Sequence, residues 1–114
     1  MKSSYRQLRA ILIYDLPMVD DEDRNVYSLF RKNIIKLGFY MVQYSVYTKV
    51  LQNENSYYQL CSKIKSVVPD KGHIVVFKMT EKQYEDMIYF AGIKNRFDSI
   101  VGGNELVVFG GEDI

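Results

Sequence analysis

The chain has 114 residues, of which 47% are hydrophobic and 25% are charged, and its formal net charge at pH 7 is +1. This length predicts one domain over residues 1–114, and no apolar run approaches the roughly 20 residues that a membrane span needs. The balanced charge argues against a uniformly basic nucleic-acid coat but leaves room for a basic patch on one face. The single cysteine, Cys61, excludes an internal disulfide framework, and we expect a cytoplasmic protein.

The first predicted element is an apolar strand within residues 8–17. Its leucine, isoleucine and tyrosine side chains suit a buried central strand, and Pro17 ends it because proline cannot donate to a ladder. Asp15 stands at the mouth of this strand, where a rigid element would hold its carboxylate toward solvent. Metal ligands and catalytic acids are often placed in this way, although turn and helix-capping aspartates are also common there.

The second predicted element is a helix that ends at Gly38. The acidic residues 20–23 supply a cap and suit the positive end of the helix dipole, and apolar residues then recur at helical spacing. The basic residues of this helix are Arg24, Arg31, Lys32 and Lys36. A solvated helix face explains them as well as a phosphate-binding face does.

Residues 39–50 have the clearest strand pattern in the chain. In one continuous strand Gln43, Ser45 and Tyr47 share a face, because side chains alternate with a period of two. Polar groups in the middle of a strand must find partners or lie at an interface. We expect these three residues to serve a dimer interface or the surroundings of Asp15, with a purely structural polar pair as the alternative.

A further helix and strand follow. The pattern over residues 53–66 predicts a helix whose apolar stripe includes Cys61, which favours a core cysteine over a nucleophile. Residues 72–79 predict the third strand. His73 is the only histidine and has no companion histidine or cysteine, so the pattern favours a surface position at the strand start over a zinc site.

The chain ends in a short predicted strand. Residues 80–83 have the spacing of a capping box that opens a short helix, residues 86–91 are expected to form a fourth strand, and a loop follows. Residues 105–109 are strongly β-prone and stand between two glycine pairs, which invites pairing outside their own domain. This order predicts an α+β, ferredoxin-like βαββαβ fold with an additional C-terminal strand.

Several short motifs, taken together, resemble one known family. The motifs are YDLP at 14–17, DR at 23–24, FRK at 30–32, GF at 38–39, QYSVY at 43–47 and TEKQ at 80–83. The resemblance extends from about Arg9 to Phe109 and depends on the order and spacing of these motifs. The chain resembles the small CRISPR-associated adaptation protein of the Cas-two family, in the form that accompanies type II systems.

This resemblance implies a homodimer that bridges two dimers of the CRISPR-associated integrase, Cas-one, while double-stranded DNA fragments are captured as new spacers. The Cas-two dimer then acts mainly as a platform and ruler for the duplex. Some members are also described as magnesium-dependent nucleases on RNA or duplex DNA, in which each protomer contributes the aspartate that ends the first strand, Asp15 here. The C-terminal strand is expected to join the partner protomer's sheet through Leu106, Val107, Val108 and Phe109.

Three functions follow from these observations. The first is duplex binding through phosphate contacts by the basic residues of the first helix, with Arg9 and Lys49 as further candidates. The second is a Mg²⁺-dependent phosphodiesterase with Asp15 as catalytic and metal-binding residue, although the sequence offers no evident second carboxylate or histidine base. The third is a toxin-type ribonuclease or RNA-binding module, which the single aromatic residue of the third strand, Phe77, disfavours.

Overall fold

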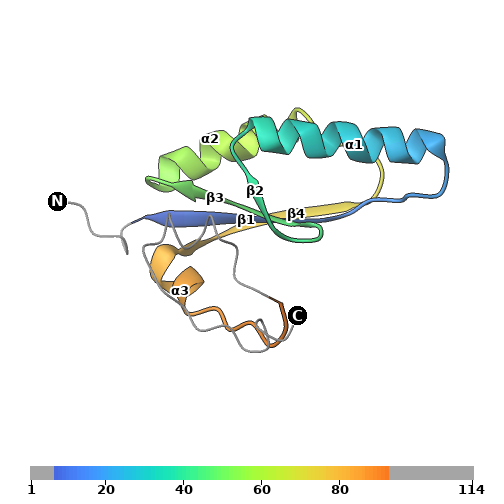
Figure 1. The fold of residues 1–114 in the computed structure, drawn as a ribbon. Helices are drawn as coiled ribbons and strands as arrows, with labels where there is room; N and C mark the ends of the chain where they lie inside the picture. The colour runs from blue at the N-terminus through green and yellow to red at the C-terminus, as the bar shows by residue number, and fades with distance from the viewer. Residues whose placement is uncertain (1–6, 93–114) are drawn as a thin grey trace.

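A computed structural model of the protein describes residues 7–92 (Figure 1). The four strands form one antiparallel sheet in the order β2-β3-β1-β4. This arrangement confirms the predicted α+β, βαββαβ fold, while the predicted strand over residues 105–109 lies outside the described residues. In chain order the elements are β1 (Leu8–Asp15), α1 (Asp21–Lys36), β2 (Tyr40–Gln43), β3 (Val46–Leu51), α2 (Glu54–Lys65), β4 (His73–Thr80) and α3 (Glu81–Glu85).

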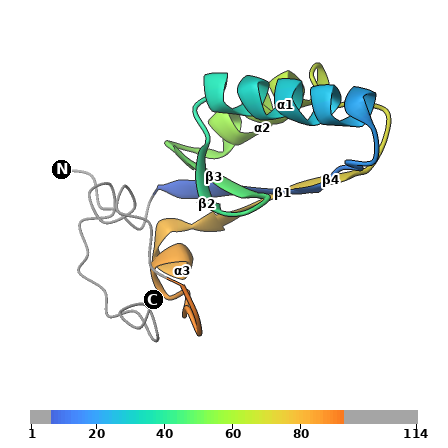
Figure 2. The same cartoon turned by 45° about the vertical axis from the view of Figure 1, so that its right-hand side comes forward.

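The core lies between the sheet and the two long helices, which cover the same face of the sheet (Figures 1 and 2). Because side chains alternate along a strand, Leu12 and Tyr14 both point from β1 into this core, and each is no more than 2% exposed. Phe30 and Ile34, one helical turn apart on α1, and Leu60 of α2 belong to the same buried cluster. The central strand therefore positions both helices.

Both long helices begin at side-chain caps. The carboxylate of Asp20 accepts from the backbone N–H of Asp23 at 2.8 Å, and the amide oxygen of Asn53 accepts from that of Ser56 at 2.8 Å. Each helix buries one stripe of side chains against the core and exposes its other side chains to solvent. Within residues 7–92, no helix combines the length and apolar character that crossing a membrane requires.

The other face of the sheet is apolar and partly exposed. The register sets Ile13 opposite Val75 and Ile11 opposite Phe77 across β1 and β4. Ile13, Val75 and Phe77 are 38%, 52% and 39% exposed, whereas Ile11 is buried at 5%. We call the three exposed residues the open sheet face. A contiguous apolar surface of this kind on a small protein usually marks an interaction site.

A buried ion pair fixes α3 at one end of β1. Arg9 is fully buried and donates to Glu81 through Nε (2.9 Å) and Nη2 (2.5 Å), and to the Tyr40 hydroxyl through Nη1 (2.6 Å). The ring of Tyr84 lies 3.9 Å from the guanidinium carbon. Burial alone would lower the pKa of Arg9, but the hydrogen bonds and charge of Glu81 raise it, so the pair stays ionised. The predicted contact of Arg9 with a DNA phosphate is therefore wrong.

The predicted single strand over residues 39–50 is also wrong, because the chain turns back on itself within it. β2 ends at Gln43, β3 begins at Val46, and Ser45 between them has a φ of 65°, in the left-handed region. The turn contains no glycine, proline or asparagine, and β-prone residues continue through it, so nothing in the local sequence marks it. Gln43, Ser45 and Tyr47 do not share one strand face.

The segment after β4 is helical first and then irregular. The predicted capping box is confirmed: Thr80 Oγ1 accepts from the N–H of Gln83 (3.1 Å), and the Gln83 side-chain oxygen accepts from the N–H of Thr80 (2.9 Å). The predicted strand over residues 86–91 is wrong, because Asp86 caps α3 and the residues up to Gly92 form no strand. In the part of the chain that the structure describes, β4 is therefore an edge strand.

We predict that Glu81→Ala lowers the free energy of unfolding by roughly 3–5 kcal/mol, because it leaves the buried Arg9 charge without a partner. The matched control is Glu54→Ala, which removes the 3.5 Å pair with Lys78 at the surface, where Glu54 is 62% exposed. That change should cost less than about 1 kcal/mol. Urea unfolding of the two variants measures both values, and equal losses would contradict the structural role of the Arg9–Glu81 pair.

Candidate metal site and nucleic-acid interface

Asp15 ends β1, and its side chain is exposed. It lies on the same side of the sheet as Ile13, because residues two apart on a strand share a face. Within residues 7–92 its carboxylate makes no ion pair and no side-chain hydrogen bond. The carboxylate is therefore available to a cation or to another molecule at the edge of the open sheet face.

His73, the first residue of β4, lies directly opposite Asp15 in the antiparallel register. Both residues line a hollow of about 450 Å³ together with Ile13 and Val75. Gly72 keeps the two strand ends close: its φ is +83°, and a Cβ there would lie 2.6 Å from the carbonyl oxygen of Asp15. The sequence indicated His73 only as a surface histidine. The signal that links it to Asp15 is the pairing of the first strand's end with the last strand's start, which the predicted fold implies.

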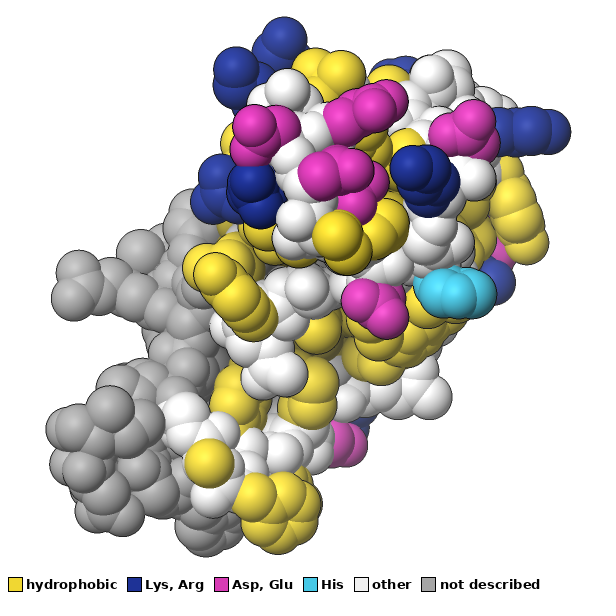
Figure 3. Space-filling view, turned by 90° about the vertical axis from the view of Figure 1, so that its right-hand side faces the viewer, with side chains coloured by type: hydrophobic (Ala, Val, Ile, Leu, Met, Phe, Trp, Pro, Cys, Tyr) yellow, Lys and Arg dark blue, Asp and Glu magenta, His cyan; other side chains and the backbone are white. Residues whose placement is uncertain are grey.

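The end of the molecule that carries Asp15 is acidic. α1 starts there with the exposed residues Asp21 and Glu22 and the buried Asp23, whose carboxylate accepts from the N–H of Val19 at 3.1 Å. Figure 3 views this end and shows acidic side chains, interspersed with basic ones, above the only histidine, drawn in cyan. A net acidic surface favours cations over phosphates.

The donors at this end fit a hydrated divalent cation only if a second copy contributes. Asp15 and His73 offer one carboxylate and one imidazole, and nowhere in residues 7–92 do three or more His, Cys, Asp or Glu side chains form a group that could hold a metal ion. Mg²⁺ prefers a few carboxylate oxygens and keeps several of its waters, while an imidazole suits transition metals better. One carboxylate from each of two copies would satisfy the preference of Mg²⁺ for a few carboxylate oxygens.

The basic residues of α1 are all exposed on the helical layer. Arg24 pairs with Asp21 one turn earlier, so part of its charge is already neutralised. Lys32 and Lys36 are one turn apart, and neither makes an ion pair with another residue in the described part of the chain. These two ammonium groups are therefore available to bind phosphates.

Tyr47 holds Arg31 in place at the surface. Nε of Arg31 donates to the Tyr47 hydroxyl at 2.9 Å, and this hydrogen bond raises the pKa of Arg31 above its ordinary value. Tyr47 is only 1% exposed and stacks on Tyr14, with ring centroids 5.8 Å apart. Burial raises the pKa of Tyr14, so this phenol stays neutral. Tyr47 thus lies in the core, where it orients a basic side chain of α1.

The structure does not bring Asp15 and the basic residues of α1 together in one copy. α1 lies on the helical side of the sheet, whereas Asp15 lies on the side of the open sheet face (Figures 1 and 2). In addition, Lys36 is roughly 22 Å along the helix axis from Asp21, at the far end of α1 from the acidic end. A duplex lying along α1 would not place its phosphates at the Asp15 of the same copy.

The remaining predicted site residues lie in separate places. Gln43 is exposed at the end of β2 and lines a hollow of about 220 Å³ with residues 87–91. Ser45 accepts, through its carbonyl, from the N–H of Tyr14 at 3.1 Å, so the hairpin turn supports the end of β1. Leu106, Val107, Val108 and Phe109 lie outside the described residues.

Comparison with known proteins gives one consistent result. Residues 8–87 match the model of a family described as CRISPR associated protein Cas2. A curated relative from Ligilactobacillus salivarius, named CRISPR-associated endoribonuclease Cas2, is 44% identical over 87 residues, which cover 76% of this chain and 86% of the relative. A relative of the same name from Streptococcus mutans serotype c is 39% identical over 105 residues, covering 92% of this chain and 94% of the relative.

A solved structure described as "Crystal structure of cas2" shares the fold. It aligns with a TM-score of 0.50 at 17% sequence identity and covers 90% of this chain and 99% of its own. At this identity the match supports the architecture and nothing about individual residues.

Proposed function

This chain belongs to the Cas2 family of CRISPR-associated proteins, and we propose that it serves spacer acquisition as a homodimer that binds duplex DNA and bridges dimers of the CRISPR-associated integrase. The observation that carries the proposal is the exposed basic face of α1, on the opposite side of the sheet from Asp15. Because new spacers vary in sequence, their carrier must contact phosphates rather than base edges. The role also requires a cytoplasmic protein.

The charges on α1 suit contact with a duplex backbone. Lys32 and Lys36 are exposed without a carboxylate partner in residues 7–92, and Arg31 is oriented by its bond to Tyr47. An oriented guanidinium loses less side-chain entropy when it meets a phosphate than a free one does. These features favour sequence-independent binding that depends on salt.

The open sheet face supports the homodimer. Ile13, Val75 and Phe77 present partly exposed apolar side chains in adjacent strands, and a second copy of the same face would cover them. In such a dimer Asp15 of each copy would lie near the two-fold axis, and the two α1 helices would face outward.

We predict that Lys32→Gln and Lys36→Gln each reduce the slope of log affinity for duplex DNA against log salt by about 0.9, because each removes one phosphate contact. Fluorescence anisotropy with two duplexes of unrelated sequence measures the slope. Lys82→Gln on α3 removes an exposed charge on the other side of the sheet and should leave the slope unchanged. A strong preference for one sequence, or a flat salt response, would contradict phosphate-based binding.

A second candidate function is metal-dependent cleavage of RNA or duplex DNA. It is favoured by the shared hollow of Asp15 and His73, and the curated relatives carry the name endoribonuclease. In this role Asp15 of each copy would hold Mg²⁺, which would activate water or polarise a phosphate. His73 would lie beside the carboxylate, and the acidic end of the molecule would favour the cation.

We predict that Asp15→Asn abolishes any Mg²⁺-dependent cleavage but leaves duplex affinity within about twofold, because Asp15 is remote from the basic face of α1. Gel assays of cleavage and binding, with Glu22→Gln as a control for loss of one acidic group at the same end, separate the two roles. Cleavage that survives in Asp15→Asn would show that Asp15 is not the metal ligand. Loss of duplex binding in Asp15→Asn would contradict the separation of the two surfaces.

A further inference from the structure

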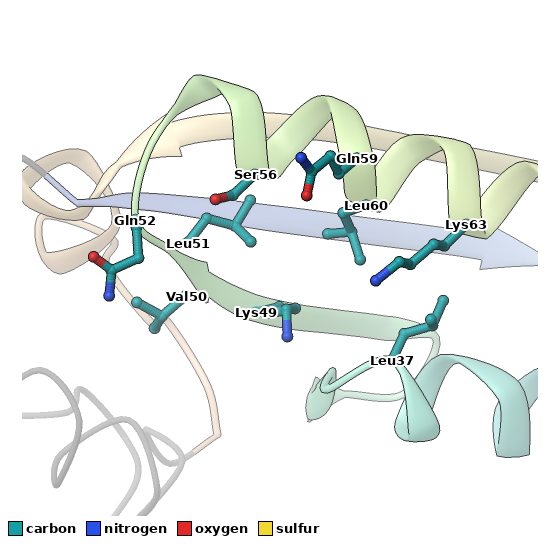
Figure 4. A pocket seen from close by; sticks show the side chains of 9 residues that line it. All are labelled: Leu37, Lys49, Val50, Leu51, Gln52, Ser56, Gln59, Leu60 and Lys63. Carbon is teal, nitrogen blue, oxygen red and sulfur yellow. The ribbon is translucent and has the colours of Figure 1, made fainter.

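A hollow of about 280 Å³ lies between α2, β3 and the end of α1 (Figure 4). Its polar lining consists of Lys49 and Gln52 from the β3 side and Ser56, Gln59 and Lys63 from the α2 side, and four aliphatic side chains complete it. Figure 4 shows Lys63 extending from α2 across the hollow and Lys49 on β3 beneath it. The hollow is on the helical layer and does not include the basic residues of α1.

All the charged side chains that line this hollow are positive. Two lysines line it, and none of its nine lining residues carries a carboxylate. The Ser56 hydroxyl already donates to Asn53 Oδ1 at 3.1 Å, so the neutral donors are the side-chain amides of Gln52 and Gln59. Lys71 and Lys78 have carboxylate partners at 3.7 and 3.5 Å. In the described part of the chain, Lys49 and Lys63 have none. Two unpaired cations at one hollow favour an anion.

Lys49 needs a partner more than an ordinary surface lysine does. Its side chain belongs to the helix-facing side of β3, opposite the small residue Ala10, and is half-buried. It passes over Gly38, which has a φ of +103°, and a Cβ at Gly38 would collide with the Lys49 amino group. Glycine therefore both allows the turn after α1 and leaves room for the ammonium. A half-buried charge without a counter-ion is costly.

The end of α1 does not by itself explain Lys49. Lysines can bind the last carbonyls of a helix. Here the carbonyls of Asn33, Ile34 and Ile35 accept from backbone N–H groups, and within residues 7–92 the Lys49 ammonium donates no hydrogen bond to the helix end. The hollow also extends away from the helix end to Lys63 and Gln59 on α2.

We propose that this hollow is a binding site for a phosphate group, with Lys49 and Lys63 supplying charge and Gln59 supplying a neutral donor. The phosphate comes either from a duplex backbone that reaches beyond α1 or from a free nucleotide. The site is separate from the duplex contact by Lys32 and Lys36, and it requires neither Asp15 nor a metal. A bound phosphate would neutralise the two ammonium groups and stabilise the fold.

The test is the midpoint of thermal unfolding of the full chain in sodium phosphate, compared with sodium chloride at the same ionic strength and pH. We expect phosphate to raise the midpoint by several degrees more than chloride at about ten times its dissociation constant. Lys63→Gln should reduce this difference to the non-specific kosmotropic effect of phosphate, because it removes one of the two charges of the site. Lys63 is exposed, so its loss does not disturb the core. Lys49→Gln should reduce the difference to the same level.

Lys65→Gln is the matched control. Lys65 is exposed in the last turn of α2 but does not line the hollow, so its variant should keep the full phosphate response. The proposal is overturned if phosphate and chloride act equally on the wild-type chain, or if Lys65→Gln loses as much of the response as Lys63→Gln. Either result would mean that phosphate acts through general charge screening.

A second measurement assigns the source of the phosphate. If it belongs to the duplex, Lys63→Gln lowers the salt slope of duplex binding by about 0.9, as a backbone contact does. If it belongs to a free nucleotide, the slope stays unchanged and a nucleoside monophosphate reproduces the thermal shift. Variants of Lys32 and Lys36 keep the phosphate shift in both cases, so failure of duplex binding by α1 is distinguishable from failure of this site.

Discussion

The pairing of β1 with a strand on each side is the constraint on which the rest of the structure depends. As the central strand, β1 must alternate its side chains between two environments. Leu12 and Tyr14 enter the core beneath the helices, while Ile13 and Asp15 lie on the opposite side. A shift of one residue in this register would exchange the two sets, burying the carboxylate and exposing the core. The buried Arg9–Glu81 pair fixes the same strand at its other end.

This alternation separates two kinds of chemistry. The helical side carries the charges that suit phosphates, on α1 and around the hollow that contains Lys49 and Lys63. The other side carries an apolar surface bordered by Asp15 and His73, at an acidic end of the molecule. A duplex and a divalent cation would therefore bind to different faces of the protein. The proposed platform role uses both faces. The apolar face would join two copies, and the helices of each copy would then face outward.

Much of the fold could be predicted, because it is encoded locally. The Asp20 cap, the helical stripe of α1 and the capping box at Thr80 are visible in short segments, and the structure contains each of them. The hairpin was not predictable, because Ser45 is the only turn-favouring residue in it and its β-prone neighbours continue the strand pattern. The partners of Arg9, Arg31 and His73 were missed for another reason. Glu81, Tyr47 and Asp15 lie 72, 16 and 58 residues from them, and only the register and packing of the sheet bring these pairs together.

The platform role requires that a second copy covers the open sheet face, so that a duplex is bound by two chains. Sedimentation equilibrium of the full chain, alone and with a saturating duplex, measures this directly. We expect a species of two chains at micromolar concentration and one duplex bound per two chains. Val75→Asp places a charge in the proposed interface and should shift the protein to single chains. A wild-type chain that remains single over this range and binds the duplex one to one would contradict the proposed dimer.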